Sequence, residues 1–206
     1  NNYFGIYFDI GSANIENVTI SDIILTDNLD YAIISNWSLG LDYYVNNLSM
    51  TKNITIKDNG GGIYVACSGF VVIANFNITN NGGMGLAIIG DKAKRVDVAN
   101  MTISGNSGSG IVIYADTNIS INDIGVFKNG GYGISLRGKF ITINNVKVDA
   151  NVDYGLTVIG YSKNVSIFNV TISNNNGGIF FNNSVGDIID ILAKNLTIRD
   201  NGGYSI

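Results

Sequence analysis

Apolar and polar residues alternate in short runs along almost the whole chain, and the same runs return in a fixed order. One repeat holds three pairs of apolar residues, the members of each pair two positions apart, such as Ile119/Ile121, Ile124/Val126 and Ile134/Leu136. This alternation, rich in Ile and Val, is typical of short strands with one buried face. The pattern therefore predicts three short strands in each repeat of about 22 to 26 residues, which leaves no room for a helix.

Two columns of Asn or Asp residues separate the apolar pairs. The first opens the form Asn, three variable residues, a small residue and a branched aliphatic residue, as in Asn129–Ile134. Its members are Asn1, Asn28, Asn59, Asn81, Asn106, Asn129, Asn151, Asn175 and Asn201. The second column lies six positions earlier and comprises Asp22, Asn53, Asn75, Asn100, Asp123, Asn145, Asn169 and Asn195. Asn suits corners because it tolerates left-handed backbone geometry and its amide can bond neighbouring backbone or a stacked amide.

The economical arrangement of such repeats is a stack of coils. Each repeat forms one coil of three strands, and equivalent strands pair in parallel with those of the next coil. Every apolar pair then points inward, and each coil covers the open side of its neighbour. At a rise of about 4.8 Å per coil, eight coils make a rod roughly 38 Å long.

The segment Asn100–Ile111 has the form Asn-x-Thr-Ile-x-x-Asn-x-x-x-Gly-Ile, and 195–206 matches it with Ser205 in place of Gly. In these motifs the chain resembles the right-handed parallel β-helix repeat proteins, the pectate-lyase-like superfold. The resemblance implies an all-β, single-stranded right-handed parallel β-helix (a β-solenoid) with three short strands per coil and about eight coils. It covers 1–206 as a single domain, with a surface insertion at about 35–48 that carries the only Trp. It leaves function open, because this superfold includes polysaccharide lyases, hydrolases, viral tailspikes, adhesins and surface proteins.

Composition removes several classes of protein. The 206 residues contain no His and no Pro, so the commonest general base and the usual zinc ligand are missing. The 12 basic residues are scattered and the net charge is -4, which gives no electrostatic footprint for nucleic acid. No apolar run is long enough to span a membrane. Cys67, the only cysteine, is expected to be a buried and inert thiol. We expect no cofactor and no metal.

Three charged residues and a Tyr recur ten positions after the first-column Asn of four consecutive repeats, at Asp91, Asp116, Lys139 and Tyr161, with Arg137 nearby. Stacking would place these side chains about 5 Å apart per coil. Two carboxylates with a Lys or Arg are what β-elimination on a uronic acid requires, so a polysaccharide lyase or a glycan-binding site at this edge is one hypothesis. The alternative is a solvated row of opposite charges with little energetic value.

Two further patterns point to the outside of the rod. Aromatic or large residues just before the small residue could bind polysaccharide or pack against another subunit; they are Phe4, Tyr31, Met84, Tyr132, Tyr154 and Tyr204. Eleven Asn-x-Ser/Thr sequons occur. Those in the second column are by-products of the repeat, so the better candidates for glycosylation are Asn36, Asn47, Asn118, Asn164 and Asn182.

The first and last repeats carry the same phase, since Asn1–Ile6 and 201–206 both match the repeat. A rod with matching ends can stack head to tail, a contact that is open-ended and builds filaments. The residues expected in that interface are Asn1, Phe4, Ile6, Tyr154, Asn201, Tyr204 and Ile206. We therefore expect a glycosylated structural protein of an extracellular, cell or virion surface whose main partner is itself. A carbohydrate-active enzyme or a glycan-binding adhesin or tail-fibre module is the alternative, with polysaccharide or a host glycan as partner.

Overall fold

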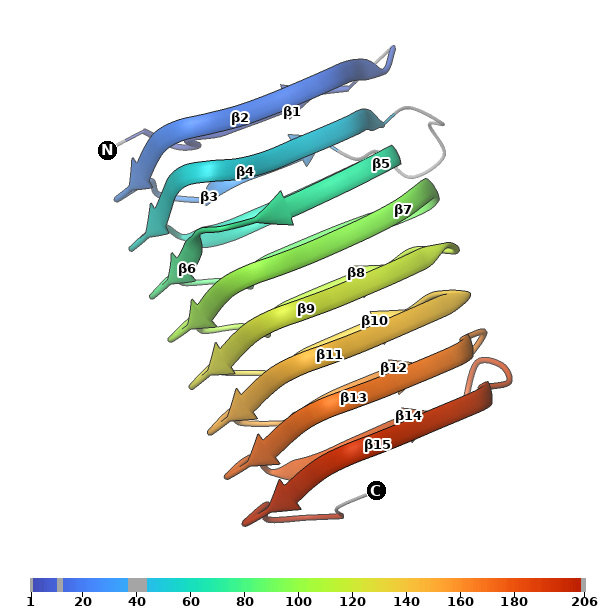
Figure 1. Ribbon diagram of the computed structural model, residues 1–206. Helices are drawn as coiled ribbons and strands as arrows, with labels where there is room; N and C mark the ends of the chain where they lie inside the picture. Colours follow the sequence, from blue (N-terminus) through green and yellow to red (C-terminus); the bar gives the residue numbers. More distant parts are fainter. Residues whose placement is uncertain (1, 11–12, 37–43, 205–206) are drawn as a thin grey trace.

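The computed structural model describes residues 2–10, 13–36 and 44–204, and in this part of the chain it contains strands and no helix. Successive coils stack along one axis, with the two ends of the chain at opposite ends of the stack (Figure 1). The strands are β1 (Ile6–Asp9), β2 (Ile15–Thr26), β3 (Tyr31–Asn36), β4 (Val45–Lys57), β5 (Gly61–Ala74), β6 (Asn77–Thr79), β7 (Leu86–Ser104), β8 (Ile111–Tyr114), β9 (Asn118–Phe127), β10 (Ile134–Arg137), β11 (Phe140–Asp149), β12 (Tyr154–Ile159), β13 (Lys163–Ser173), β14 (Gly177–Asn182) and β15 (Ile189–Arg199).

A typical coil consists of one short strand and one long bent strand. In the coils β8–β9, β10–β11, β12–β13 and β14–β15, the short strand forms one face and the two arms of the long strand form the other two. All pairings between coils are parallel. The structure thus has the predicted three-faced parallel solenoid of about eight coils.

The second Asn/Asp column bends the long strands, and the strand runs through the bend at every member except Asn75, which lies between β5 and β6. All eight of its members have φ between 50° and 66°, the left-handed region. Asn and Asp tolerate this conformation better than most residues because their short polar side chains can bond locally. One residue with positive φ turns the chain while pairing continues on both sides, so the two strands predicted on either side of this column, such as those of Ile119/Ile121 and Ile124/Val126, form one bent strand.

The core is a set of columns of equivalent apolar residues. Register pairs Ile119 with Ile141 and Ile141 with Val165, and these residues are 0–1% exposed. The short strands stack likewise, with Ile111, Ile134 and Leu156 in one column. Cys67 is fully buried, and this burial raises the pKa of its thiol.

The first Asn column forms an unbroken ladder of amides from Asn28 to Asn201, buried as far as Asn175 and partly buried at Asn201. The Oδ1 atom of each ladder Asn accepts hydrogen bonds from the backbone N–H and the Nδ2 of the ladder Asn one coil earlier. The N···O distances are 2.9–3.1 Å for the backbone donors and 2.7–3.1 Å for the amide donors. Positive φ falls on the residue just before each ladder Asn, as at Lys128 and Ala150. The ladder position is therefore selected for its amide and the second column for its backbone conformation.

The last coil is less covered than those above it. Ile191 is 44% exposed, whereas Val165, its partner one coil earlier, is fully buried. Among the described residues, no helix is long and apolar enough to cross a lipid bilayer. The middle of the expected insertion, residues 37–43 with Trp37, lies outside the described residues; its flanks continue into β3 and β4.

Candidate functional site

The charged residues singled out in the sequence come together at the corner between the short strands and the long strands. Three consecutive corners, after β8, β10 and β12, enclose a pocket of about 450 Å³. We call it the corner pocket; it is lined by Asp116, Arg137, Lys139, Tyr161 and Lys163. The structure therefore gathers Asp116, Arg137 and Lys139 around one hollow. The side chain of Asp91 lies outside the described part.

Backbone and side-chain hydrogen bonds stack the three corners on one another. The Lys139 N–H donates to the Thr117 carbonyl (3.0 Å), and the Thr117 hydroxyl donates to the Lys94 carbonyl (2.6 Å). The buried Ser162 hydroxyl donates to the Ile159 carbonyl (2.6 Å) and accepts the Gly138 N–H (3.4 Å). The pocket thus rests on backbone fixed by partners from neighbouring coils.

Tyr161 occupies an unusual conformation for an aromatic residue. Its φ is 68° and its side chain is 61% exposed. Left-handed geometry costs about 1–2 kcal/mol for a residue with a Cβ, and bulky residues rarely adopt it. A Cβ added to Gly186 would lie 2.6 Å from the Tyr161 ring, so the ring packs directly over that glycine. The Tyr161 ring therefore projects from the corner toward solvent, and its contact with Gly186 fixes its position.

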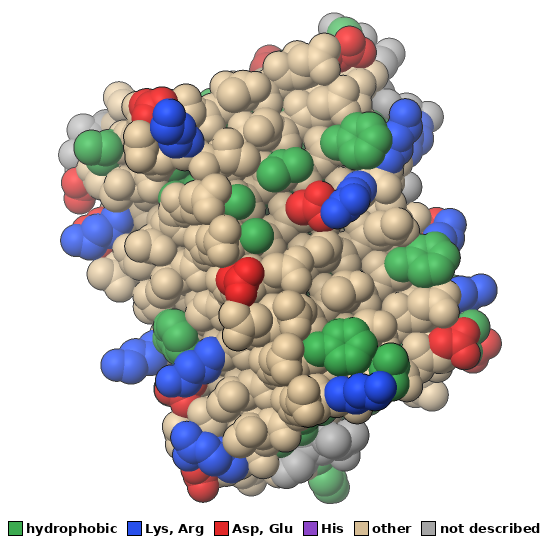
Figure 2. Space-filling view, in the orientation of Figure 1, with side chains coloured by type: hydrophobic (Ala, Val, Ile, Leu, Met, Phe, Trp, Pro, Cys, Tyr) green, Lys and Arg blue, Asp and Glu red, His purple; other side chains and the backbone are tan. Residues whose placement is uncertain are grey.

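Among the described residues that line the corner pocket, Arg137, Lys139 and Lys163 are basic and Asp116 is acidic. Lys139 Nζ lies 3.0 Å from Asp116 Oδ2, in an ion pair whose partners are both about half exposed. The Arg137 guanidinium lies over the Tyr114 ring, 5.6 Å from its centroid. No ion pair involves Lys163 among the residues that the structure describes. In Figure 2, Lys and Arg gather mainly along the two lateral edges, and the broad middle of the face is largely uncharged.

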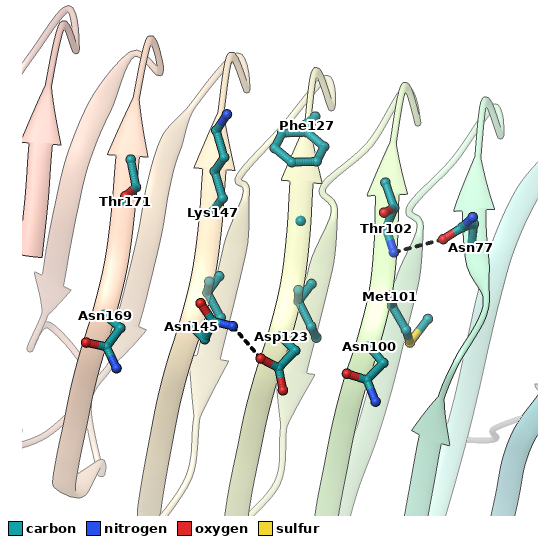
Figure 3. A pocket seen from close by; sticks show the side chains of 13 residues that line it. Asn77, Asn100, Met101, Thr102, Asp123, Phe127, Asn145, Lys147, Asn169 and Thr171 are labelled. Atoms are coloured by element: carbon teal, nitrogen blue, oxygen red, sulfur yellow. Dashed lines mark hydrogen bonds between the residues drawn. The ribbon is translucent and has the colours of Figure 1, made fainter.

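A second hollow, which was not predicted from the sequence, lies on the long strands beside their bend. It is a groove of about 510 Å³ that crosses several coils. Figure 3 shows Asn100, Asp123, Asn145 and Asn169 in one row along the bend, and Thr102, Lys147 and Thr171 in the next. We call it the bend groove.

An aromatic ring and a glycine shape the bend groove. A Cβ added to Gly125 would lie 2.4 Å from the Phe127 ring, so this ring lies across the glycine. Lys147 Nζ is 5.7 Å from the Phe127 centroid. The sequence signal was present, since Gly125 stands in a column otherwise filled by residues with side chains, but register was needed to read it.

The predicted glycosylation sites differ in what their amides do. Asn118 and Asn164 are exposed, and no side-chain hydrogen bond of theirs is found among the described residues. The Asn47 amide donates to Asn17 (3.0 Å), and Asn182 Oδ1 accepts the Ser184 N–H (3.1 Å). The side chain of Asn36 lies outside the described residues. In the second column, Asn53, Asn100, Asn169 and Asn195 donate through their amides to the preceding coil.

The residues expected in an end-to-end interface are placed unequally. Tyr204 is 80% exposed in the last coil, and Phe4 stacks on Tyr7 in the first with ring centroids 5.1 Å apart. Tyr154 lies two coils before Tyr204 and stacks on Phe180, with ring centroids 4.9 Å apart. Asn201 ends the ladder, and Ile6 is partly buried; Asn1 and Ile206 lie outside the described residues. Within the described part, no group of three His, Cys, Asp or Glu side chains could hold a metal ion.

Comparison with known proteins agrees with this geometry. Residues 40–201 match the family described as the right-handed β-helix region, and the chain belongs to that family. The match spans most of the coils but is not tied to any one activity. Neither the curated proteins nor the solved structures compared with the chain give a match.

Proposed function

We propose that this solenoid is a structural, non-enzymatic component of an extracellular surface, and that it extends by stacking end to end on further copies. The observation that carries the proposal is the repeated parallel register, in which each coil buries the inward column of its neighbour. Ile191 belongs to a column that is fully buried at Ile141 and Val165, and it is 44% exposed. A further coil in register would cover it and recover the hydrophobic stabilisation found at every earlier step.

The first coil supplies a matching surface. Ile6, Phe8 and Val18 are only partly buried, although their column partners in the next coils include the fully buried Ile33 and Leu48. The strands are parallel throughout, so the last coil of one copy and the first coil of the next can pair in the same sense as neighbouring coils. Such a contact is heterologous and builds a filament.

Electron microscopy of the full polypeptide with its native ends tests this proposal. Rods should lengthen with protein concentration, and Ile191→Lys should shorten them, because it places a charge in the contact. Thr142→Lys, on an exposed side face, is the matched control and should leave lengths unchanged. Rods of a single short length at all concentrations would contradict the proposal.

Glycosylation is part of the proposal, and Asn118 and Asn164 are the preferred sites because their amides are exposed and uncommitted. Material from the native host should carry extra mass that a deglycosylating treatment removes. Asn118→Gln with Asn164→Gln should lower that mass, whereas Asn100→Gln should not. An unmodified native mass would refute this part.

A second candidate function, the binding of a neutral glycan chain, is favoured by the bend groove. Its amides and hydroxyls can bond sugar hydroxyls, and the Phe127 ring offers a face for stacking. Titration with neutral oligosaccharides should show binding that Phe127→Ala abolishes. Phe140→Ala, at a ring 50% exposed outside the groove, is the control and should bind normally.

A further inference from the structure

We propose that Asn176 is a site of spontaneous covalent modification, at which the asparagine deamidates to aspartate and isoaspartate. This inference does not rest on end-to-end stacking or on glycosylation, because it concerns the reaction of one side chain with its own backbone and with water. The observation behind it is that one short sequence occurs in two different structural settings.

The tripeptide Asn-Gly-Gly occurs five times in the chain. Its Asn residues are Asn59, Asn81, Asn129, Asn176 and Asn201. Asn is a chemically labile residue, and a following Gly favours deamidation because it has no side chain to shield its backbone nitrogen. Identical tripeptides should react alike in an unfolded chain, so any difference between them in the folded protein comes from the structure.

Four of the five tripeptides begin on the amide ladder, which holds both reacting groups in place. The Asn129 amide, for example, donates to Asn151 Oδ1 (2.9 Å) and to the Ile103 carbonyl (3.2 Å). The attacking nitrogen, that of Gly130, donates to the Asn106 carbonyl at 2.8 Å. The equivalent glycine N–H groups at the other three ladder sites also donate to a carbonyl of the preceding coil, at 2.7–2.9 Å. Reaction at a ladder site therefore requires the local opening of several hydrogen bonds.

Asn176 lies outside the ladder, one residue after the ladder Asn175 and just before β14. Its side chain is exposed, and no hydrogen bond of its amide is found in the part of the chain that the structure describes. The side chain can therefore rotate toward the backbone nitrogen of Gly177 without breaking a hydrogen bond.

The reaction at Asn176 needs only water as a co-reactant. The Gly177 nitrogen attacks Asn176 Cγ and gives up its proton, the new N–Cγ bond replaces the Cγ–Nδ2 bond, and ammonia leaves. Water then opens the resulting cyclic imide at either of its carbonyl groups, which yields aspartate or isoaspartate.

Isoaspartate at this position would disturb the contact with the end of the last coil. The Gly178 N–H donates to the Tyr204 carbonyl (2.8 Å), and the Gly202 N–H donates to the Asn175 carbonyl (2.9 Å). Isoaspartate inserts one methylene into the main chain between Asn175 and Gly178, so these two hydrogen bonds cannot both keep their geometry.

The experiment follows deamidation of the full chain at mildly alkaline pH, folded and in denaturant, by peptide mapping with mass spectrometry. In the folded protein we expect Asn176 to deamidate at least about tenfold faster than the three ladder sites that have coils on both sides. Those sites are Asn59, Asn81 and Asn129. In denaturant, where the ladder is absent, all four sites should react at rates within about threefold of one another.

Two variants and a second readout locate the product. Asn176→Gln should remove most of the isoaspartate that an isoaspartyl methyltransferase labels in the folded protein, because the longer side chain closes the imide ring far more slowly. Asn118→Gln, at another exposed asparagine, is the control and should leave the labelling unchanged. Hydrogen exchange at Gly178 should be faster in the isoaspartate form than in the unmodified protein.

Two results would overturn the inference. One is an equal rate of deamidation at Asn176 and Asn129 in the folded protein. The other is a preference for Asn176 that persists in denaturant, since the neighbouring residues and not the fold would then be its cause. Unchanged hydrogen exchange at Gly178 in the isoaspartate form would refute the effect on the last coil.

Discussion

At the scale of single residues, two kinds of corner position use Asn for different reasons. The ladder position needs a buried amide that both donates and accepts, and Asn supplies this at every step from Asn28 to Asn201. The bend position and the position just before the ladder need a left-handed backbone. The left-handed positions tolerate more residue types than the ladder position does, since Lys128 and Ala150 also occupy them.

Ala150 is poorly suited to its conformation. Its φ is 58°, and the equivalent positions one coil away hold Lys128 and Asn174. We predict that Ala150→Asn raises the free energy of unfolding by about 0.5–1 kcal/mol, because Asn tolerates the left-handed region better. Asn80→Ala, at the equivalent position of an earlier coil, should lower it by about as much. Denaturant unfolding of both variants measures the effect, and a loss of stability in Ala150→Asn would contradict it.

Asn129 tests the ladder itself. Its Oδ1 accepts the Asn106 N–H at 3.1 Å, and its Nδ2 donates to Asn151 at 2.9 Å, all in a buried setting. Asn129→Ala leaves that backbone N–H without a partner, so we predict a loss of about 3 kcal/mol or more. Asn77→Ala removes a single acceptor from an exposed N–H, that of Thr102 (3.1 Å), and should cost about 1 kcal/mol at most. Equal losses of unfolding free energy in the two variants, measured with denaturant, would show that a ladder Asn stabilises the fold no more than an exposed Asn does.

Asp149 couples stability to pH. The hydrogen bond from Ser173 (2.6 Å) is the main cause that holds the pKa of the Asp149 carboxyl below its usual range. Partial burial opposes this effect, and a hydrogen bond from Asn174 (2.7 Å) adds to it. A carboxyl with a lowered folded pKa stabilises the fold above its unfolded pKa, near 3.9, and this contribution is lost as pH falls through the folded pKa. Asp149→Asn should therefore lower stability at pH 7 by up to about 1 kcal/mol. The difference in unfolding free energy between the unchanged protein and Asp149→Asn should shrink as the pH falls below 3. A difference that stays constant from pH 7 to pH 2 would contradict this account.

At the scale of the elements, the small residue after the ladder Asn lets each short strand begin close to its neighbours. A Cβ on Gly133 would lie 2.4 Å from Val148 Cγ1 and 2.5 Å from the Gly155 carbonyl oxygen. The same crowding recurs at Gly110. The small residue of the repeat is therefore a packing requirement set by the coils above and below.

Gly133→Ala should destabilise the fold by about 1–3 kcal/mol, because the added methyl forces backbone apart between coils. Gly202→Ala is the control: its nearest neighbour, the Asn176 carbonyl oxygen, lies 3.5 Å away, which is ordinary contact. Melting temperatures of the two variants measure the difference. A loss at Gly202 as large as that at Gly133 would show that crowding is not the cause.

At the scale of the whole molecule, the solenoid is a one-dimensional stack in which each coil contacts only its neighbours. Stability in such a stack is approximately a sum of coil and interface contributions, so coils with two neighbours are protected most. We predict that amide hydrogen exchange is slowest in β9 and β11 and fastest in β15, whose side chains are mostly exposed. If copies stack, exchange in β15 should slow with protein concentration. Uniform protection along the chain would contradict this picture.

The fold could be predicted from the sequence in nearly all its parts, whereas the candidate sites could be predicted only in part. Alternating pairs such as Ile119/Ile121 predict which side chains point inward, and the Asn columns predict where each coil turns. The residues Asp116, Lys139 and Tyr161 of the corner pocket could be found in the sequence because each lies ten positions after a ladder Asn. The bend groove could not be predicted, because it depends on how Phe127 lies across Gly125 and on which coils meet there.

Sequence by itself determined the coil, because the period of two and the recurring Asn positions allow one economical stack of parallel strands. Tertiary structure decided which column forms the amide ladder and which bends the strand, since Asn predominates in both. It also decided that Asp116, Lys139 and Tyr161 share one hollow. The physical reason is that local patterning fixes the direction of each side chain, while register and corner length fix the distances between side chains of different coils.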